Sequence, residues 1–147
     1  MSHITRGISE IARYGMQYRT ERMKALGLNG SHPNYLVEIC ADPGISQNRL
    51  AQRLCFNKSN VARQVAFLEE NGFVTCTPSP KDKRVTKLYP TEKTLALLPQ
   101  ISAMLDAWEK HLTQDLSPED KAALAALLAR LKERAGTWTE VDPCAEA

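Results

Sequence analysis

Aromatic residues are scarce in this chain: Phe, Trp and Tyr make up only 6% of its 147 residues. A core drawn from this composition must be mainly aliphatic. No apolar run approaches the ~20 residues that a bilayer-spanning helix needs. The segment up to Arg13 carries charges where a signal peptide would have an apolar stretch. We therefore expect a cytoplasmic protein with no membrane partner.

Several kinds of chemistry are also missing. The four cysteines (Cys40, Cys55, Cys76 and Cys144) form no CxxC pair and have no metal-ligand spacing, and the three histidines are scattered. We expect reduced thiols that pack as small apolar side chains, and neither a metal nor a cofactor. The sequence contains no nucleophile elbow, no phosphate-binding loop and no pair of carboxylates at a useful spacing. An enzyme is therefore not expected.

Charge is distributed unevenly along the chain. The net charge is only +2, but nine Lys or Arg oppose four Asp or Glu between Gly44 and Lys93. From Thr94 to Ala147 the balance reverses, with five basic residues against nine acidic ones. A basic middle followed by an acidic end favours a polyanion-binding face built into one domain.

Helical periodicity is clear near the N-terminus. Isoleucines recur at helical spacing in a first helix that is predicted to end at Gly27. A second helix is expected to begin at Ser31 or His32, with Pro33 in its first turn, and to end before Asp42.

Two leucine-rich helices are predicted in the last third of the chain. Thr91 is the expected N-cap of a long helix, and Pro99 inside it should bend the helix or delay its regular start. Ser117 and Pro118 are typical of the start of a second helix, which should end at Gly136. Its leucines recur at i, i+3, i+4 and i+7: Leu124, Leu127, Leu128 and Leu131.

The basic middle predicts a helix-turn-helix followed by a β-hairpin. Ser46 and Asn57 are the expected N-caps of two short helices, 47–54 and 58–70, joined by a tight turn. Apolar-alternating runs at 73–77 and 85–89 flank a highly charged tip, SPKDKRV (79–85). On the second helix, small residues, short polar groups and one Arg lie opposite the apolar face, which suits close approach to base edges.

This arrangement predicts contacts with double-stranded DNA. Arg49, Arg53 and Lys58 are candidates for phosphate contacts, which position a protein without reading sequence. The start of the second helix is expected in the major groove and the charged tip in the minor groove. The candidate DNA-binding residues are Arg49, Lys58, Ser59, Asn60, Arg63, Gln64, Lys81, Asp82, Lys83 and Arg84.

These motifs resemble the MarR-type winged-helix transcriptional regulators. The close match covers about 26–100. Its matching stretches are Leu26-Gly27-Leu28, Pro43-Gly44-Ile45-Ser46-Gln47, Asn57-Lys58-Ser59-Asn60-Val61-Ala62-Arg63, Gly72-Phe73-Val74, Asp82-Lys83-Arg84 and Pro90-Thr91-Glu92-Lys93. The resemblance implies a mainly α fold with a small β-hairpin wing. It implies one domain over 1–147, with a winged helix-turn-helix lobe at 30–92, a helical dimerisation region at 1–29 and 93–136, and a tail at 137–147.

The same resemblance implies a function. A homodimer would bind a pseudo-palindromic operator, with Arg84 in the minor groove, Asp82 bracing the wing, and Ser59, Asn60 and Arg63 reading the major groove. It would act as a repressor that a small lipophilic or phenolic effector releases. Candidate effector-binding residues are Tyr14, Tyr18, His32 and Tyr35, although tyrosines at helical spacing can equally belong to the core.

Two alternatives stay open. The first is a thiol-switched regulator, which requires Cys55 or Cys76 to be exposed with a lowered pKa. The second is a winged-helix protein-interaction module whose basic face meets an acidic protein and which lacks specific DNA binding. Arg63 among small residues favours DNA, because protein-binding hot spots are rich in larger aromatic side chains.

Overall fold

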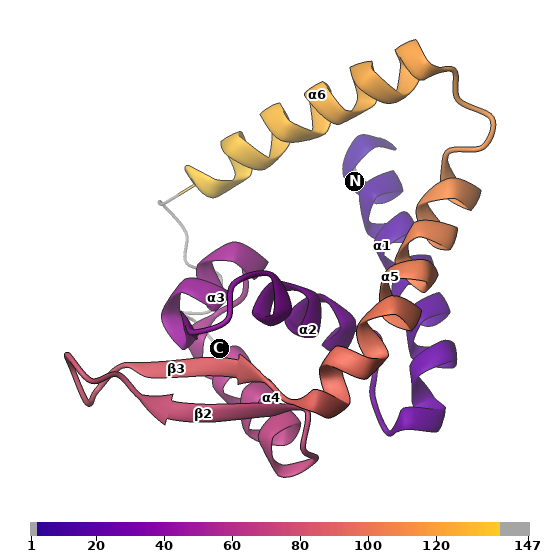
Figure 1. The fold of residues 1–147 in the computed structure, drawn as a ribbon. Helices are drawn as coiled ribbons and strands as arrows, with labels where there is room; N and C mark the ends of the chain where they lie inside the picture. The colour runs from indigo at the N-terminus through magenta and orange to yellow at the C-terminus, as the bar shows by residue number, and fades with distance from the viewer. Residues whose placement is uncertain (1–2, 139–147) are drawn as a thin grey trace. The chain divides into compact units, whose positions relative to one another are not determined.

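Helices make up most of the computed structural model, which describes residues 3–138. Its elements are α1 (His3–Met23), the 3-10 helix η1 (Lys24–Leu26), α2 (His32–Ala41), β1 (Ile45–Ser46), α3 (Gln47–Leu54), α4 (Lys58–Glu70), β2 (Val74–Pro78), β3 (Thr86–Pro90), α5 (Glu92–Leu112) and α6 (Pro118–Gly136) (Figure 1). The predicted fold class, mainly α with a small β wing, is confirmed. The chain divides into two compact units, Met1–Trp108 and Glu109–Ala147. Within the described range, none of the helices has the length and hydropathy to cross a membrane.

At the junction between α1 and α2, the first helical segment ends where the sequence predicts. The chain leaves η1 at Gly27, whose φ of 73° is left-handed and whose N–H donates to Lys24 O at 3.0 Å. The predicted stop at Gly27 is thus confirmed. Ser31 precedes α2 but makes no cap bond, and its Oγ instead donates to Asn29 Oδ1 at 2.6 Å.

Both predicted N-caps of the helix-turn-helix are confirmed. Ser46 Oγ accepts from the N–H of Arg49 at 3.2 Å, and Asn57 Oδ1 accepts from the N–H of Asn60 at 2.7 Å. The turn between α3 and α4 passes through Cys55, whose φ of 56° lies in the left-handed region. These local bonds set where α4 begins and fix its first turn.

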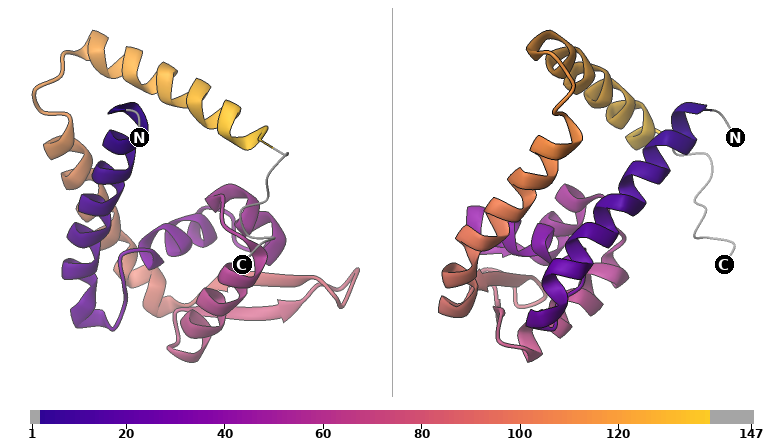
Figure 2. Two further views of the ribbon diagram at one scale, coloured as in Figure 1. Left: turned by 180° about the vertical axis from the view of Figure 1, so that it is seen from behind. Right: turned by 90° about the vertical axis from the view of Figure 1, so that its right-hand side faces the viewer.

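A small antiparallel sheet carries the wing. Its strand order is β1-β3-β2, with Cys76 opposite Leu88 on one side and Ile45 opposite Leu88 on the other. β2 and β3 run side by side and project beyond α2, α3 and α4 as a hairpin (Figures 1 and 2). The strand β1 was not predicted, because two residues are too few to show the alternation that marks a strand.

The core of the first unit is mainly aliphatic, as the composition predicts. Its fully buried side chains include two aromatic ones, Tyr35 and Phe73, and a larger aliphatic set: Leu36, Ile39, Leu50, Val61, Leu68, Val74, Leu88 and Ile101. α2, α3, α4 and the sheet all contribute to this core. It holds α4 by one face and leaves the opposite face open.

The part of α5 inside the first unit packs on α1. Tyr18 Oη donates to Met104 O at 3.2 Å, and the Tyr18 ring lies 5.1 Å from the Trp108 ring. α5 begins at Glu92, with Thr91 Oγ1 accepting from the N–H of Thr94 at 3.4 Å. Pro99 lies inside the helix and does not delay its start.

The second unit contains α6. Its N-cap is Ser117, whose Oγ accepts from the N–H of Asp120 at 3.1 Å. The four leucines of the predicted stripe are 40% to 53% exposed: Leu124, Leu127, Leu128 and Leu131. The predicted helix start at Ser117 and end at Gly136 are confirmed.

Candidate nucleic-acid interface

The outer face of α4 is open to solvent. Val61, Val65 and Leu68 are buried on its inner face. Among the predicted contact residues, Lys58, Ser59 and Arg63 are exposed and Asn60 is half-buried. Ser59 Oγ donates to the capping Asn57 Oδ1 at 2.9 Å, which leaves the lone pairs of Ser59 for other partners.

Gln64 on α4 is engaged by a side chain from another helix, α2. Gln64 is half-buried, and its Oε1 lies 2.8 Å from Nε2 of His32 at the start of α2. The N–H of Asn29 donates to His32 Nδ1 at 3.0 Å, and the His32 ring stacks on Phe67. Burial lowers the pKa of His32, while the bond to Gln64 acts in the opposite direction. His32 is therefore the neutral imidazole that joins α2 to α4.

This neutral His32 predicts acid sensitivity of the fold. Above the ordinary His pKa of about 6.5 the residue is neutral in both states, so pH has no effect through it. Below that pH the unfolded chain binds the proton more readily than the folded one, so the free energy of unfolding falls until pH passes the lowered folded pKa. The fall in melting temperature between about pH 7.5 and about pH 5 should be smaller for His32→Phe than for wild type. Equal falls would contradict this.

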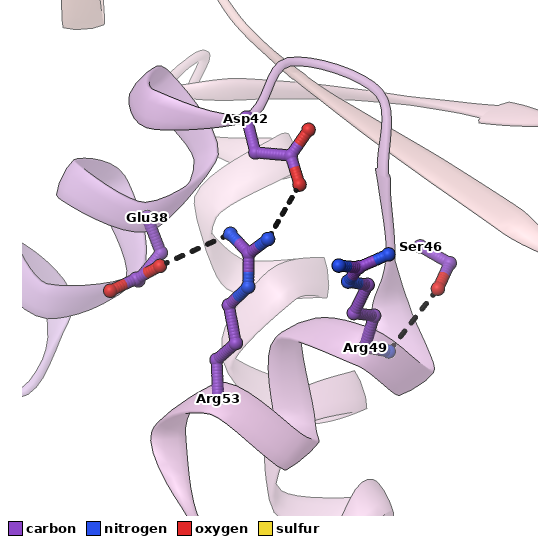
Figure 3. Close-up of polar contacts among 5 residues, drawn as sticks. All are labelled: Glu38, Asp42, Ser46, Arg49 and Arg53. Carbon is purple, nitrogen blue, oxygen red and sulfur yellow. Dashed lines mark hydrogen bonds and ion pairs between the residues drawn. The ribbon is translucent and has the colours of Figure 1, made fainter.

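The two arginines of α3 have different surroundings (Figure 3). Arg53 donates through Nη2 to Asp42 Oδ2 at 2.8 Å and through Nη1 to Glu38 Oε2 at 3.4 Å. Arg53 was predicted to contact phosphates, whereas here it ties α3 to the end of α2. Arg49 is exposed, and its backbone N–H is the group that Ser46 caps. Arg49 is thus exposed with no ion pair among residues 3–138, whereas Arg53 is paired with two carboxylates.

The tip of the wing is organised around Asp82. Its Oδ1 accepts from the backbone N–H and Nε of Arg84 at 3.0 and 3.2 Å, and its Oδ2 accepts from Nη2 at 3.3 Å. These bonds to Arg84 lower the pKa of Asp82, so it is charged at neutral pH. The Arg84 side chain remains 91% exposed, and Lys81 and Lys83 are exposed beside it. Asp82 therefore holds an arginine that still faces solvent.

The wing is also joined to α4. The N–H of Cys76 on β2 donates to Glu69 Oε2 at 3.0 Å. Burial, followed by the hydrogen bond and the charge of Glu69, raises the pKa of the Cys76 thiol to about 12. The role of Glu69 could not be predicted from the sequence, since nothing local marks a carboxylate that accepts from a strand residue seven positions later.

The cysteines should differ in reactivity. Cys76 is almost entirely protonated at neutral pH, and Cys55 is exposed in the helix-turn-helix turn. In the native protein, iodoacetamide should label Cys55 about tenfold faster than Cys76, because the thiolate of an accessible thiol is the nucleophile. Mass spectrometry of timed digests measures both rates, and the same labelling in urea is the control that should equalise them. Equal labelling rates for the two cysteines in the native protein would contradict this prediction.

The predicted effector-binding residues make different contacts in the structure. Tyr14 lines an open hollow of about 270 Å³ with Glu10, Arg13 and Gln17, all on α1. The other three have separate partners: Tyr18 packs on Trp108, His32 on Phe67, and Tyr35 on Phe56. Tyr35 is buried, and its Oη has no hydrogen-bond partner among the described residues. Within residues 3–138 no cluster of His, Cys, Asp and Glu could hold a metal ion; Cys144 lies outside them.

Taken together, these features define a winged helix-turn-helix protein of the DNA-binding class. A family model described as "MarR family" matches residues 29–86. An uncharacterised HTH-type transcriptional regulator of Bacillus subtilis, YybA, is 31% identical over 133 residues, which cover 90% of this chain and 89% of YybA. The chain belongs to the MarR family of transcriptional regulators.

Solved structures agree. The transcriptional regulator SlyA superposes with a TM-score of 0.88 at 29% identity, over 91% of this chain and 94% of SlyA. A protein from Listeria monocytogenes assigned to the MarR family, solved in complex with a 26mer DNA, gives 0.86 at 28% identity, over 91% and 89%. Because MarR regulators bind DNA and are not enzymes, the expectation of a DNA-binding regulator rather than an enzyme is confirmed.

Proposed function

We propose that this regulator is a homodimeric repressor that binds a pseudo-palindromic operator and leaves it when a small lipophilic or phenolic effector binds. In this proposal α4 lies in the major groove, where Ser59, Asn60 and Arg63 contact bases. The wing reaches the minor groove with Arg84, and Lys81 and Lys83 lie near phosphates. Arg49 and Lys58 contact phosphates at the edge of the major groove.

One observation carries the DNA part of the proposal. Within one lobe, α4 presents Arg63 opposite its buried face, and the wing presents an Arg84 that Asp82 holds but does not cover. Arg can bind guanine in the major groove and is attracted to a narrow minor groove. The relative from Listeria monocytogenes was solved on DNA, which supports the same use of this fold.

The dimer part rests on apolar side chains of the described residues that are exposed within each unit. On α1, Ile4, Ile8 and Ile11 are 65%, 45% and 48% exposed. On α6, the four leucines of the stripe are exposed as well. Soluble proteins seldom leave contiguous apolar stripes open, and a second copy of the chain is the usual cover. We therefore assign 1–29 and 93–136 to dimerisation and 30–92 to DNA binding, with 137–147 as a tail of one domain, 1–147.

A thiol switch is a second candidate for the release step, and the exposure of Cys55 favours it at that residue. Cys55 occupies the turn that leads into α4, so a bulky adduct there would disturb the start of the helix. The high pKa of Cys76 argues against a switch at that position. Screening small phenols and thiol oxidants on the bound operator separates the two kinds of release.

Selection from a random duplex library tests the proposal. The enriched duplex and a scrambled one would then be titrated at several salt concentrations, and sedimentation equilibrium would give the oligomeric state. An inverted repeat with half-sites about one helical turn apart and a large specific-to-scrambled ratio is expected. No enriched motif and equal salt slopes for both duplexes would contradict specific binding and leave polyanion attraction, or an acidic protein partner, for the basic face.

A further inference from the structure

We propose that His32 is a positioning residue that fixes the Gln64 amide so that its nitrogen, a hydrogen-bond donor, is the group free to meet DNA. The inference rests on the proposed contact between α4 and the major groove. It adds a determinant of base preference that lies outside the helix-turn-helix, at the start of α2.

The His32 ring has a fixed position. It is 2% exposed, and it stacks on Phe67 of α4 with ring centroids 4.9 Å apart and an angle of 8° between the planes. Both ring nitrogens are engaged, one with the N–H of Asn29 and the other with Gln64 Oε1. A buried ring held at its face and at both nitrogens has no freedom to turn.

The chemistry of these bonds decides which nitrogen carries the proton. A backbone N–H can only donate, so His32 Nδ1, which receives the bond from Asn29, must be the acceptor. In a neutral imidazole the other nitrogen then bears the hydrogen, so Nε2 is a donor. It can bond only to the oxygen of the Gln64 amide, which settles the orientation of that amide from chemistry as well as from geometry.

The loop that supplies the Asn29 N–H is itself held by α1. Arg19 Nε donates to Gly30 O at 2.7 Å, and the N–H of Gly30 donates to Thr20 Oγ1 at 2.9 Å. The donor that selects the His32 tautomer is therefore fixed by two bonds to a long helix. A continuous set of contacts runs from α1 through His32 to α4 within the first unit.

The consequence for recognition concerns the two ends of the Gln64 amide. Its oxygen is taken by His32, and its nitrogen has no partner among residues 3–138. A Gln side chain that is free to rotate can turn its oxygen or its nitrogen toward a base. It pairs well with adenine, because the adenine edge offers one donor and one acceptor side by side. Held by His32, Gln64 favours acceptor-rich edges such as O6 and N7 of guanine.

His32→Phe is the test variant because it keeps the ring stack on Phe67 and removes both nitrogens. Selection from a random duplex library would be run for wild type, His32→Phe, Gln64→Ala and the double variant. Gln64→Ala should lower the preference for guanine at one position of each half-site about fivefold. His32→Phe should make the base preference at that same position less selective. In the Gln64→Ala background, His32→Phe should add nothing at that position.

Gln64→Glu keeps an oxygen for His32 and replaces the donor by a second acceptor. It should shift the base preference at the same operator position toward cytosine, because the N4 amino group of cytosine donates a hydrogen bond. This variant leaves His32 untouched, so it remains informative even where His32→Phe unfolds the lobe.

Each result separates this inference from the proposed function. An enriched operator with wild-type base preference in all Gln64 variants overturns the inference and leaves operator binding intact. An effect of His32→Phe that persists undiminished in the Gln64→Ala background also overturns it, because His32 would then act by another route. Absence of any enriched operator for wild type contradicts the proposed function itself.

Discussion

Alanine in place of Gly30 is expected to lower the free energy of unfolding by about 2–3 kcal/mol. Gly30 lies where the loop after η1 passes against α1. A Cβ at this position would lie 2.5 Å from Met16 O and 2.6 Å from Thr20 Oγ1. The carbonyl oxygen belongs to the backbone of a long helix and cannot swing away, so the loop or the helix must shift.

Moving the loop would lower the free energy of unfolding by more than the steric clash of the new Cβ alone. Both backbone polar groups of Gly30 bond to α1, through Arg19 Nε at 2.7 Å and Thr20 Oγ1 at 2.9 Å, and moving the loop lengthens both bonds. Urea denaturation measures the change. Gly7→Ala is the matched control, since a Cβ there meets nothing within 4 Å and alanine favours the helix by up to about 1 kcal/mol. A Gly30→Ala midpoint equal to that of wild type would contradict the close packing.

The predictions that hold best are those that depend on near neighbours in the chain. Ser46, Asn57 and Ser117 each cap a helix by accepting from an N–H three residues later. Gly27 ends the first helical segment because its φ is positive. In each case the physical cause lies within one helical turn, so the local sequence suffices to find it.

Contacts between distant residues could not be found in this way. His32 and Gln64 are 32 residues apart, and no pattern marks either as the partner of the other. The sequence makes Arg53 a candidate for a phosphate contact, and it does not show that two carboxylates one turn apart, Glu38 on α2 and Asp42 just after it, pair with the guanidinium. The spacing of these two acids is visible in the sequence, whereas the approach of α3 to them requires the fold.

A stripe of leucines leaves a similar ambiguity. Periodicity shows that Leu124, Leu127, Leu128 and Leu131 share a face of α6, but it does not tell whether that face meets the same chain or another. Within the unit that contains α6 these leucines are exposed, and that exposure supports the dimer in our proposal. Tyr18, by contrast, packs within its own chain, because its ring lies against Trp108 and its hydroxyl donates to Met104 O on α5.

Arg63→Ala is expected to weaken binding to the selected operator by about 1–3 kcal/mol and to relax base preference at one position of each half-site. Arg63 is exposed on α4 and has no ion-pair partner among residues 3–138, so its guanidinium is free for two parallel bonds to guanine.

Arg84→Ala should instead weaken binding mainly where the flanks have a narrow minor groove, because that groove attracts Arg through its width and potential. The two losses thus differ in which base pairs they affect.

Arg53→Ala is the matched control for Arg63→Ala, because both changes remove one guanidinium from the same lobe. Arg53 is held by Asp42 and Glu38, so its loss should leave the ratio of specific to scrambled affinity unchanged (Figure 3). Competition titrations of both duplexes at a fixed salt concentration measure that ratio. If Arg63→Ala lowers both affinities by the same factor and leaves the ratio unchanged, the effect of Arg63 is a general loss of positive charge, and α4 reads no base through this residue. If only Arg63→Ala lowers it, the face opposite Val61 and Val65 is the one that meets the bases.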